Sequence, residues 1–150
     1  MLNRNHAIAT RPYRGFTLVE VLVALLVLTV GLLGYAGMQT TAMKFTNSAH
    51  LRTSATNLAY DIADRMRANV DSARGGNYDK DFGKDPNPGG VAGEDLDQWI
   101  NDVQTVLPDG EARIVTQSSG RALIEMRWTD DRTDSGAGNS TTTFELRTRI

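Results

Sequence analysis

Apolar residues fill the first part of the chain almost without interruption and then recur at helical spacing. Residues 16–38 are nearly all apolar, and their number is close to the roughly 20 that a helix needs to cross a bilayer. Further along, apolar residues fall three and four positions apart, as on one face of a helix. They are Met38, Ala42, Phe45, Ala49, Ala55, Leu58, Ile62 and Met66. The pattern predicts one long helix over residues 16–69, with 16–38 in lipid and 39–69 packed on a soluble head.

The head is predicted to cover residues 70–150. Residues 70–93 are rich in Gly, Asp and Pro and predict a long loop. Residues 94–107 predict a helix with one apolar face, formed by Leu96, Trp99, Ile100, Val103 and Leu107. Alternating residues within 111–150 then predict three strands, over 112–117, 121–128 and 142–150, the first two joined as a hairpin by residues 118–120.

The order of these elements predicts an α+β fold. A long N-terminal helix would pack on a small head that contains a short helix and a three-stranded antiparallel sheet, with one sheet face buried against the long helix. The length of 150 residues and the hydrophobic content of 40% suit one such domain with an anchor rather than two domains.

Charge and residue types exclude most catalytic classes. Residues 1–15 carry a net charge of +3, residues 16–69 of +1 and residues 70–150 of −6, which together make the net charge of −2. The chain has no Cys, so disulfides are excluded, and His50, the one His after residue 15, is predicted to lie on the surface of the long helix. Nucleophile-elbow and phosphate-loop motifs are absent from the sequence. We expect no enzyme activity, cofactor or metal.

The segment from Arg14 to Glu20 is the most informative motif. A Gly15-Phe16 junction lies before the apolar stretch, whereas a secretory signal peptide places its cleavage site after it. Glu20 sits inside the apolar run, where a carboxylate costs about 2.5 to 3.5 kcal/mol at mid-bilayer depth, and such a charge persists when it is paired. A membrane anchor with a snorkelling Glu20 is the simpler alternative.

This arrangement resembles the class III leader of type IV prepilins. The resemblance implies a leader peptide over residues 1–15, cleavage between Gly15 and Phe16 by prepilin peptidase, and methylation of the new amine of Phe16. It also implies that Glu20 pairs with the N-terminal amine of a neighbouring subunit when residues 16–38 pack in a filament core.

One other route of export remains as an alternative. An ordinary signal peptidase site near Tyr35-Ala36-Gly37 is possible but would discard Glu20, whereas a twin-arginine signal is unsupported because its adjacent Arg pair is missing. The three arginines in residues 1–15 predict that this end stays in the cytoplasm and that the head is exported.

Gly31, Gly34 and Gly37 lie three apart in the second half of the apolar run. Each weakens local helix propensity by about 1 kcal/mol relative to Ala. They are interpreted either as small residues for close helix packing or as points of helix flexibility when subunits enter a filament. Many major pilins carry Pro at the position of Gly37, so this chain departs from that pattern.

Two clusters of charged residues allow weaker hypotheses. Asp79, Asp81 and Asp85 form one acidic cluster and Asp130, Asp131 and Asp134 another, but neither follows the ligand spacing of a calcium loop, so solvated loops are favoured. The predicted strands carry five arginines that could form a basic stripe for DNA, but Glu111, Glu125 and Glu145 are interleaved with them. These are Arg113, Arg121, Arg127, Arg147 and Arg149.

Over nearly its whole length the chain resembles the minor pilins of the type IV pilus modification, or PilV-type, family. The order of elements carries this resemblance, together with Trp99, Pro108 and Trp128. It implies a structural subunit that supports pilus assembly or priming, twitching motility and attachment.

The implied partners are prepilin peptidase/methyltransferase, other minor and major pilins and the inner-membrane assembly platform. The implied location is the bacterial inner membrane and then the filament. The alternatives are a pseudopilin of type II secretion and a DNA- or surface-binding module.

Overall fold

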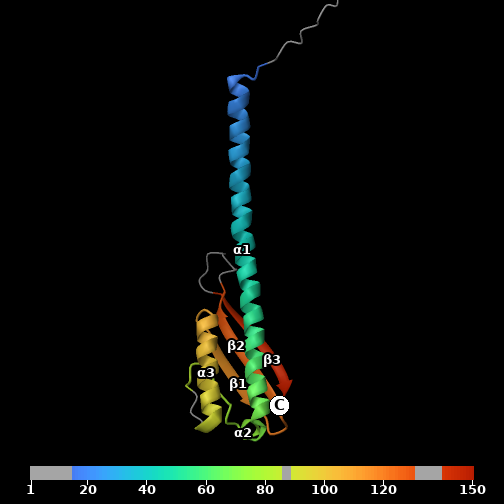
Figure 1. The fold of residues 1–150 in the computed structure, drawn as a ribbon, viewed down its shortest axis with the longest axis vertical. Coiled ribbons are helices and arrows are strands. Elements are labelled where there is room, and N and C mark those ends of the chain that lie inside the picture. The colour runs from blue at the N-terminus through green and yellow to red at the C-terminus, as the bar shows by residue number, and fades with distance from the viewer. Residues whose placement is uncertain (1–14, 86–88, 131–139) are drawn as a thin grey trace, which may run out of the picture. The chain divides into compact units, whose positions relative to one another are not determined.

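The computed structural model describes residues 15–85, 89–130 and 140–150. Its backbone forms two compact units, one ending at Thr40 and the other beginning at Thr41, and each is described by itself. Figure 1 shows the elements, which are α1 (Leu18–Ala68), α2 (Val70–Arg74), α3 (Gly90–Val106), β1 (Glu111–Thr116), β2 (Arg121–Thr129) and β3 (Thr141–Arg149).

The first unit contains the apolar half of α1. Its large hydrophobic side chains are at least half exposed on every side, from Leu18 to Met38. An 18-residue window of α1 has a mean hydropathy of 2.4, and none of it is buried within the protein. By length and composition α1 is able to cross a membrane, and this apolar surface needs lipid or other helices to cover it.

The second unit is built on a three-stranded antiparallel sheet with the order β1-β2-β3. A tight turn joins β1 to β2: the N–H of Gly120 donates to the carbonyl of Gln117 at 2.8 Å. Gly120 has a φ of 78°, and an added Cβ would lie 3.0 Å from the carbonyl oxygen of Ile150. Only glycine suits both the left-handed backbone and this close approach. The predicted hairpin is therefore present.

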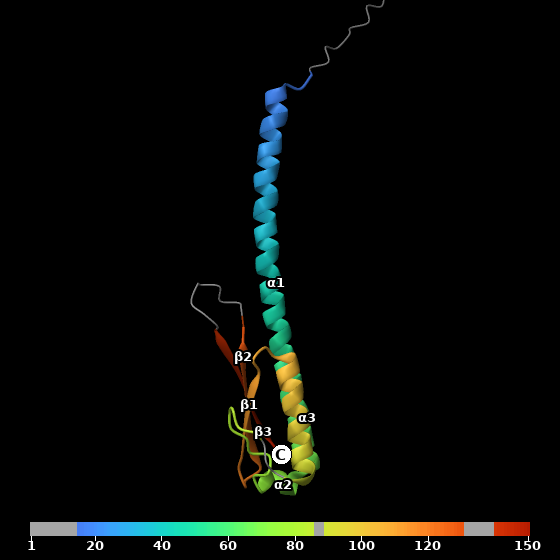
Figure 2. The ribbon, with the colours of Figure 1, turned by 90° about the vertical axis from the view of Figure 1, so that its left-hand side faces the viewer.

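One face of the sheet is buried under α3 and the part of α1 that begins at Thr41 (Figure 2). Alternate residues of β2 point into this layer and are at most 3% exposed, as the predicted alternation requires. They are Ala122, Ile124, Met126 and Trp128. The fully buried Trp99 of α3 contributes its apolar ring to the same core, and its Nε1–H donates to the carbonyl of Leu58 at 2.8 Å. The predicted α+β fold is confirmed.

The predicted loop over residues 70–93 is wrong at both of its ends. Residues 70–74 form α2, and α3 begins at Gly90, four residues before the predicted start at Glu94. Within the segment, Lys80 pairs with Ile114 as an isolated antiparallel bridge along the free edge of β1. Buried Ala73 and Ala92 help to hold the two helical ends, so packing overrides the local Gly and Asp signal.

The buried face of α1 also differs from the predicted face near the start of the second unit. Phe45 is 58% exposed and Met38 66% exposed, whereas Ser48 is 1% exposed. The hydroxyl of Ser48 donates to Oδ2 of Asp130 at 2.7 Å, and Asp130 is itself 4% exposed. A polar contact between residues 82 positions apart therefore replaces the expected apolar contact. From Ala55 to Met66 the predicted spacing holds, with Ala55, Ile62 and Met66 fully buried.

Tyr78 lies at the centre of a polar cluster between α3 and the end of α1. Its side chain is buried, and its hydroxyl donates to Oδ2 of Asp95 at 2.5 Å and accepts from Nδ2 of Asn69 at 3.3 Å. Arg65 completes the cluster, with Nη1 3.6 Å from Oδ1 of Asp95. Burial, followed by the hydrogen bond to Asp95, raises the pKa of Tyr78 to about 12.

The raised pKa of Tyr78 predicts a loss of stability at high pH. The folded protein keeps the phenol of Tyr78 protonated at pH values above its ordinary pKa of 10.0. The protonated hydroxyl therefore contributes fully to the stability of the fold below pH 10, and this stabilisation is lost as the pH rises toward about 12. We expect the difference in free energy of unfolding between the parent chain and Tyr78→Phe to shrink over this interval, measured by denaturant titration in detergent. A difference that stays constant from pH 9 to pH 12 would contradict the assignment.

Candidate functional site

The junction between Gly15 and Phe16 lies in the non-helical segment before α1. The ring of Phe16 is 84% exposed, and an added Cβ at Gly15 would have no atom within 4 Å. Helical structure begins only at Leu18. The predicted scissile bond therefore lies in an exposed, non-helical segment, which is accessible to a peptidase.

Thr17 caps the first turn of α1, and sequence reasoning missed this role. The N–H of Glu20 donates to Oγ1 of Thr17 at 3.2 Å, which satisfies one of the free donors at the helix start. Thr17 and Glu20 are three residues apart, the spacing of a capping box, and the acidic residue lies in the first turn, where the helix dipole favours negative charge. The Thr-x-x-Glu pattern could have indicated this in the sequence.

Glu20 lies on an otherwise apolar surface. Val19 is 71% exposed, Val21 50% and Leu22 59%, so the carboxylate is surrounded by exposed apolar side chains. Among residues 15–85, 89–130 and 140–150, no cation forms an ion pair with Glu20. The cap explains why an acidic residue suits the start of the helix. It does not neutralise the carboxylate of Glu20, which needs a counterion once other helices cover this apolar surface of α1.

The three glycines of the apolar run lie inside an uninterrupted helix. The backbone is α-helical from Leu18 to Ala68, and an added Cβ at Gly31, Gly34 or Gly37 would meet no atom within 4 Å. The hydroxyl of Thr29 in the same segment donates to the carbonyl of Leu26 at 2.8 Å, so this polar group is satisfied within the helix. Among the described residues no atom lies close enough to require glycine at the three positions, and their predicted role in flexibility stays a prediction.

Three of the five arginines considered for a basic stripe are paired with acidic residues, as the interleaved glutamates suggested. All five lie on the face of the sheet opposite the core, here called the outer face. Nη1 of Arg113 lies 3.1 Å from Oε2 of Glu125, Arg127 pairs with Glu111, and Arg147 pairs with Glu145. The interleaved glutamates therefore neutralise much of the stripe. Arg121 and Arg149 have no acidic partner within the described part of the chain.

The acidic residues considered for calcium have other contacts. Oδ1 of Asp79 accepts from both the N–H and the hydroxyl of Thr116 at 2.6 Å. Oδ1 of Asp81 accepts from the N–H of Phe82 at 3.0 Å, which lowers the pKa of this exposed carboxyl. Within the described ranges no three His, Cys, Asp or Glu residues are grouped to hold a metal ion. Asp131 and Asp134 lie outside these ranges.

His50 lies on α1 with an exposed side chain, as the sequence analysis predicts. It lies inside α1, which runs from Leu18 to Ala68, and its immediate neighbour Leu51 is buried in the core. A surface position of this kind has no partner arrangement for general base chemistry.

Comparison with known proteins supports the N-terminal assignment. A family model described as the prokaryotic N-terminal methylation motif matches residues 10–36. This range contains Gly15, Phe16, Glu20 and the first two glycines of the apolar run. Searches of curated proteins and of solved structures find no match. The match, with the apolar helix and the fold of the head, supports a type IV pilin-like or pseudopilin protein of the prepilin type, a substrate of prepilin peptidase.

Proposed function

We propose that this protein is a minor pilin of a type IV pilus. In this proposal it is a structural subunit that helps to prime or support assembly of the filament, and through it twitching motility and attachment. The single observation that carries the proposal is the match of residues 10–36 to the methylation motif, placed immediately before and within a helix able to cross a membrane. The small head with one antiparallel sheet supports it, since it offers packing surfaces rather than catalytic groups.

The proposed division of the chain follows from the same observation. Residues 1–15 are the leader, residues 16–38 the part of α1 that lies in the inner membrane and later in the filament core, and residues 39–69 the part that packs on the head formed by residues 70–150. The basic residues before Gly15 keep that end in the cytoplasm, and the head lies in the periplasm. Prepilin peptidase/methyltransferase cuts before Phe16 and methylates its amine.

Assembly gives the charge of Glu20 its partner. When apolar helices pack together, the carboxylate is removed from lipid headgroups and water, and an unpaired buried charge would oppose association. The amine of Phe16 on a neighbouring subunit supplies the opposite charge. The partners are therefore other minor and major pilins, delivered by the inner-membrane assembly platform.

The glycines at positions 31, 34 and 37 give this segment its capacity to loosen during assembly. Replacing all three with Ala is expected to add about 1 kcal/mol of helix propensity at each position without a steric clash in the chain. Amide hydrogen exchange of residues 28–40 in detergent should slow at least tenfold, and incorporation into filaments should fall. Unchanged exchange with reduced incorporation would instead assign the glycines to close packing between helices.

Deletion of the gene in its own host tests the proposed function. The amount of pilin sheared from the cell surface is measured beside the profile of secreted proteins. Loss of pili with normal secretion supports a minor pilin, and normal pili with impaired secretion would make the protein a pseudopilin of type II secretion. Complementation with the parent chain and with Gly15→Ala controls for effects on neighbouring genes.

A DNA-binding role on the filament has less support. Three of the five arginines on the outer face are neutralised by Glu111, Glu125 and Glu145. Two unpaired cations contribute only about two phosphate contacts, far fewer than the 6 to 10 of proteins whose DNA affinity depends strongly on salt.

A further inference from the structure

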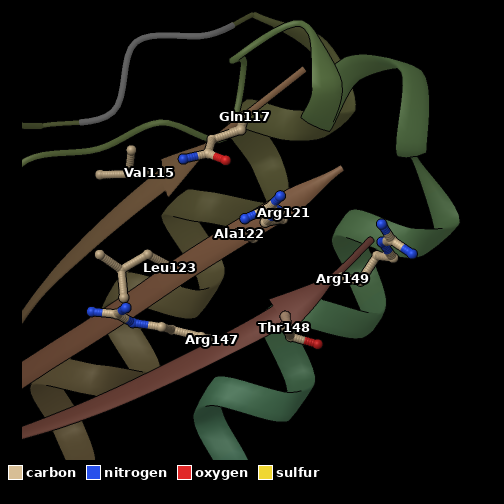
Figure 3. A pocket seen from close by; sticks show the side chains of 8 residues that line it. All are labelled: Val115, Gln117, Arg121, Ala122, Leu123, Arg147, Thr148 and Arg149. Atoms are coloured by element: carbon tan, nitrogen blue, oxygen red, sulfur yellow. The ribbon is translucent and has the colours of Figure 1, made fainter. Parts of the chain in front are cut away.

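The outer face of the sheet has one covered end and one open end. At the covered end, Lys80 pairs with Ile114 along the edge of β1, and the ring of Phe82 covers Arg127, with the guanidinium 4.3 Å from the ring centroid. At the other end an open pocket of about 540 Å³ lies between the strands. Figure 3 shows its lining, with Val115 and Gln117 on one side and Arg147 and Arg149 on the other.

An unneutralised pair of arginines forms one half of this pocket. Arg121 of β2 and Arg149 of β3 are opposite each other in the register of the two strands. Both side chains are exposed, and neither forms an ion pair or a hydrogen bond with another side chain in the described ranges. Like charges directly opposite each other destabilise a sheet, and an anion between them would remove that repulsion. The pair contrasts with the three neutralised arginines on the same face.

An apolar patch forms the other half of the pocket. Val115 and Leu123 are directly opposite each other in the register of β1 and β2, and both are only half-buried although they point away from the core. Arg147 flanks Leu123 on β3 and is already paired with Glu145. The pocket therefore presents two rows that lie across the strands. The apolar row is Val115 and Leu123, and the cationic row, two residues further along the strands, is Arg121 and Arg149.

We propose that this pocket binds an extended acidic segment of a partner protein. In an extended segment, side chains two positions apart point the same way and are about 7 Å apart, which is the spacing between the two rows. An apolar side chain of the partner covers Val115 and Leu123, and a carboxylate two positions away lies between Arg121 and Arg149. Carboxylate and guanidinium form the strongest side-chain hydrogen bonds available on a surface.

Peptide chemistry fits the pocket better than a nucleic acid or a sugar. A polyanion would extend over the next register row, where Glu125 and Glu145 are opposite each other and are already paired with Arg113 and Arg147, so this row adds no unpaired cation for a phosphate. None of the residues that line the pocket is aromatic, so it lacks the stacking surface on which bases and sugar rings rest. The proposal concerns the head alone and does not depend on whether the protein acts in a pilus or in secretion.

A peptide titration tests the site. The full chain in zwitterionic detergent is titrated with a fluorescent, capped peptide that contains Leu-Ser-Glu, and binding is followed by anisotropy. The matched peptides contain Leu-Ser-Gln, which removes the carboxylate, and Ala-Ser-Glu, which removes the apolar side chain. Saturable binding of the first peptide is expected, with at least tenfold weaker binding of each of the other two.

Variants of the protein locate the binding. Arg121→Gln with Arg149→Gln is expected to weaken binding of the acidic peptide at least tenfold, and Arg113→Gln, on the same face outside the pocket, should change it less than twofold. All three side chains are on the surface of the sheet, so the circular dichroism should stay unchanged. No saturable binding, equal binding of the Gln peptide or an equal effect of Arg113→Gln would overturn the proposal. So would tighter binding of a single-stranded oligonucleotide of the same charge.

Discussion

A chain with Gly15→Ala is expected to remain uncut in its host, with the leader still attached and no entry into filaments. The reason lies in the peptidase and not in the fold, since an added Cβ at Gly15 meets no atom within 4 Å and Gly15 does not adopt the left-handed backbone. Alanine is strained only where φ is positive, so the substitution changes only what the enzyme must accommodate beside the scissile bond. The intact mass of the membrane-extracted protein measures the result.

The matched control is Gly89→Ala. Gly89 also has no atom within 4 Å of an added Cβ, but it lies in the head, immediately before α3. We expect this chain to be cut normally and to have the mature mass. A Gly15→Ala chain with the same mature mass would show that the leader assignment is wrong, and loss of cleavage in both variants would point to a general defect in export.

The elements that could be predicted from the sequence are those whose pattern is repeated over several turns or pairs. The alternation from Ala122 to Trp128 follows the pleat of β2, and the spacing from Leu96 to Val103 follows α3, because each repeat buries a side chain in the same core. The N-terminal motif could be predicted for another reason: the cleavage site, apolar helix and single charge occur at fixed offsets.

What the sequence could not predict depends on contacts between distant residues. Ser48 is buried beside Asp130, to which its hydroxyl donates, and a polar residue on a helix gives no sign of such a partner. Lys80 joins the edge of β1 from within a stretch that has only loop signals. Arg113 is neutralised by Glu125 because of the register between two strands. Interleaved charges in the sequence could suggest ion pairs on this face, but they could not identify which residues pair.

Glu20→Gln is expected to be inserted and cut normally and to enter filaments at least a hundredfold less well than the parent chain. Removing one partner of a buried ion pair costs about 3 to 5 kcal/mol, and each 1.4 kcal/mol is a factor of ten. Here the uncompensated charge would be the amine of Phe16 on the neighbouring subunit. Glutamine keeps the size of the side chain and is itself accepted at this position of a capping box, so the helix start is preserved. Quantitative blotting of sheared filaments against the membrane pool measures the ratio.

Thr17→Ala separates the charge of Glu20 from its place in the helix cap. This variant removes the acceptor for the N–H of Glu20, which costs about 1 kcal/mol of helix stability, but it keeps the carboxylate. It should lower incorporation far less than Glu20→Gln does. If the two variants are equally impaired, Glu20 acts through the first turn of α1, and the charge needs no partner on another subunit. If only Glu20→Gln is impaired, the carboxylate acts across the interface between subunits.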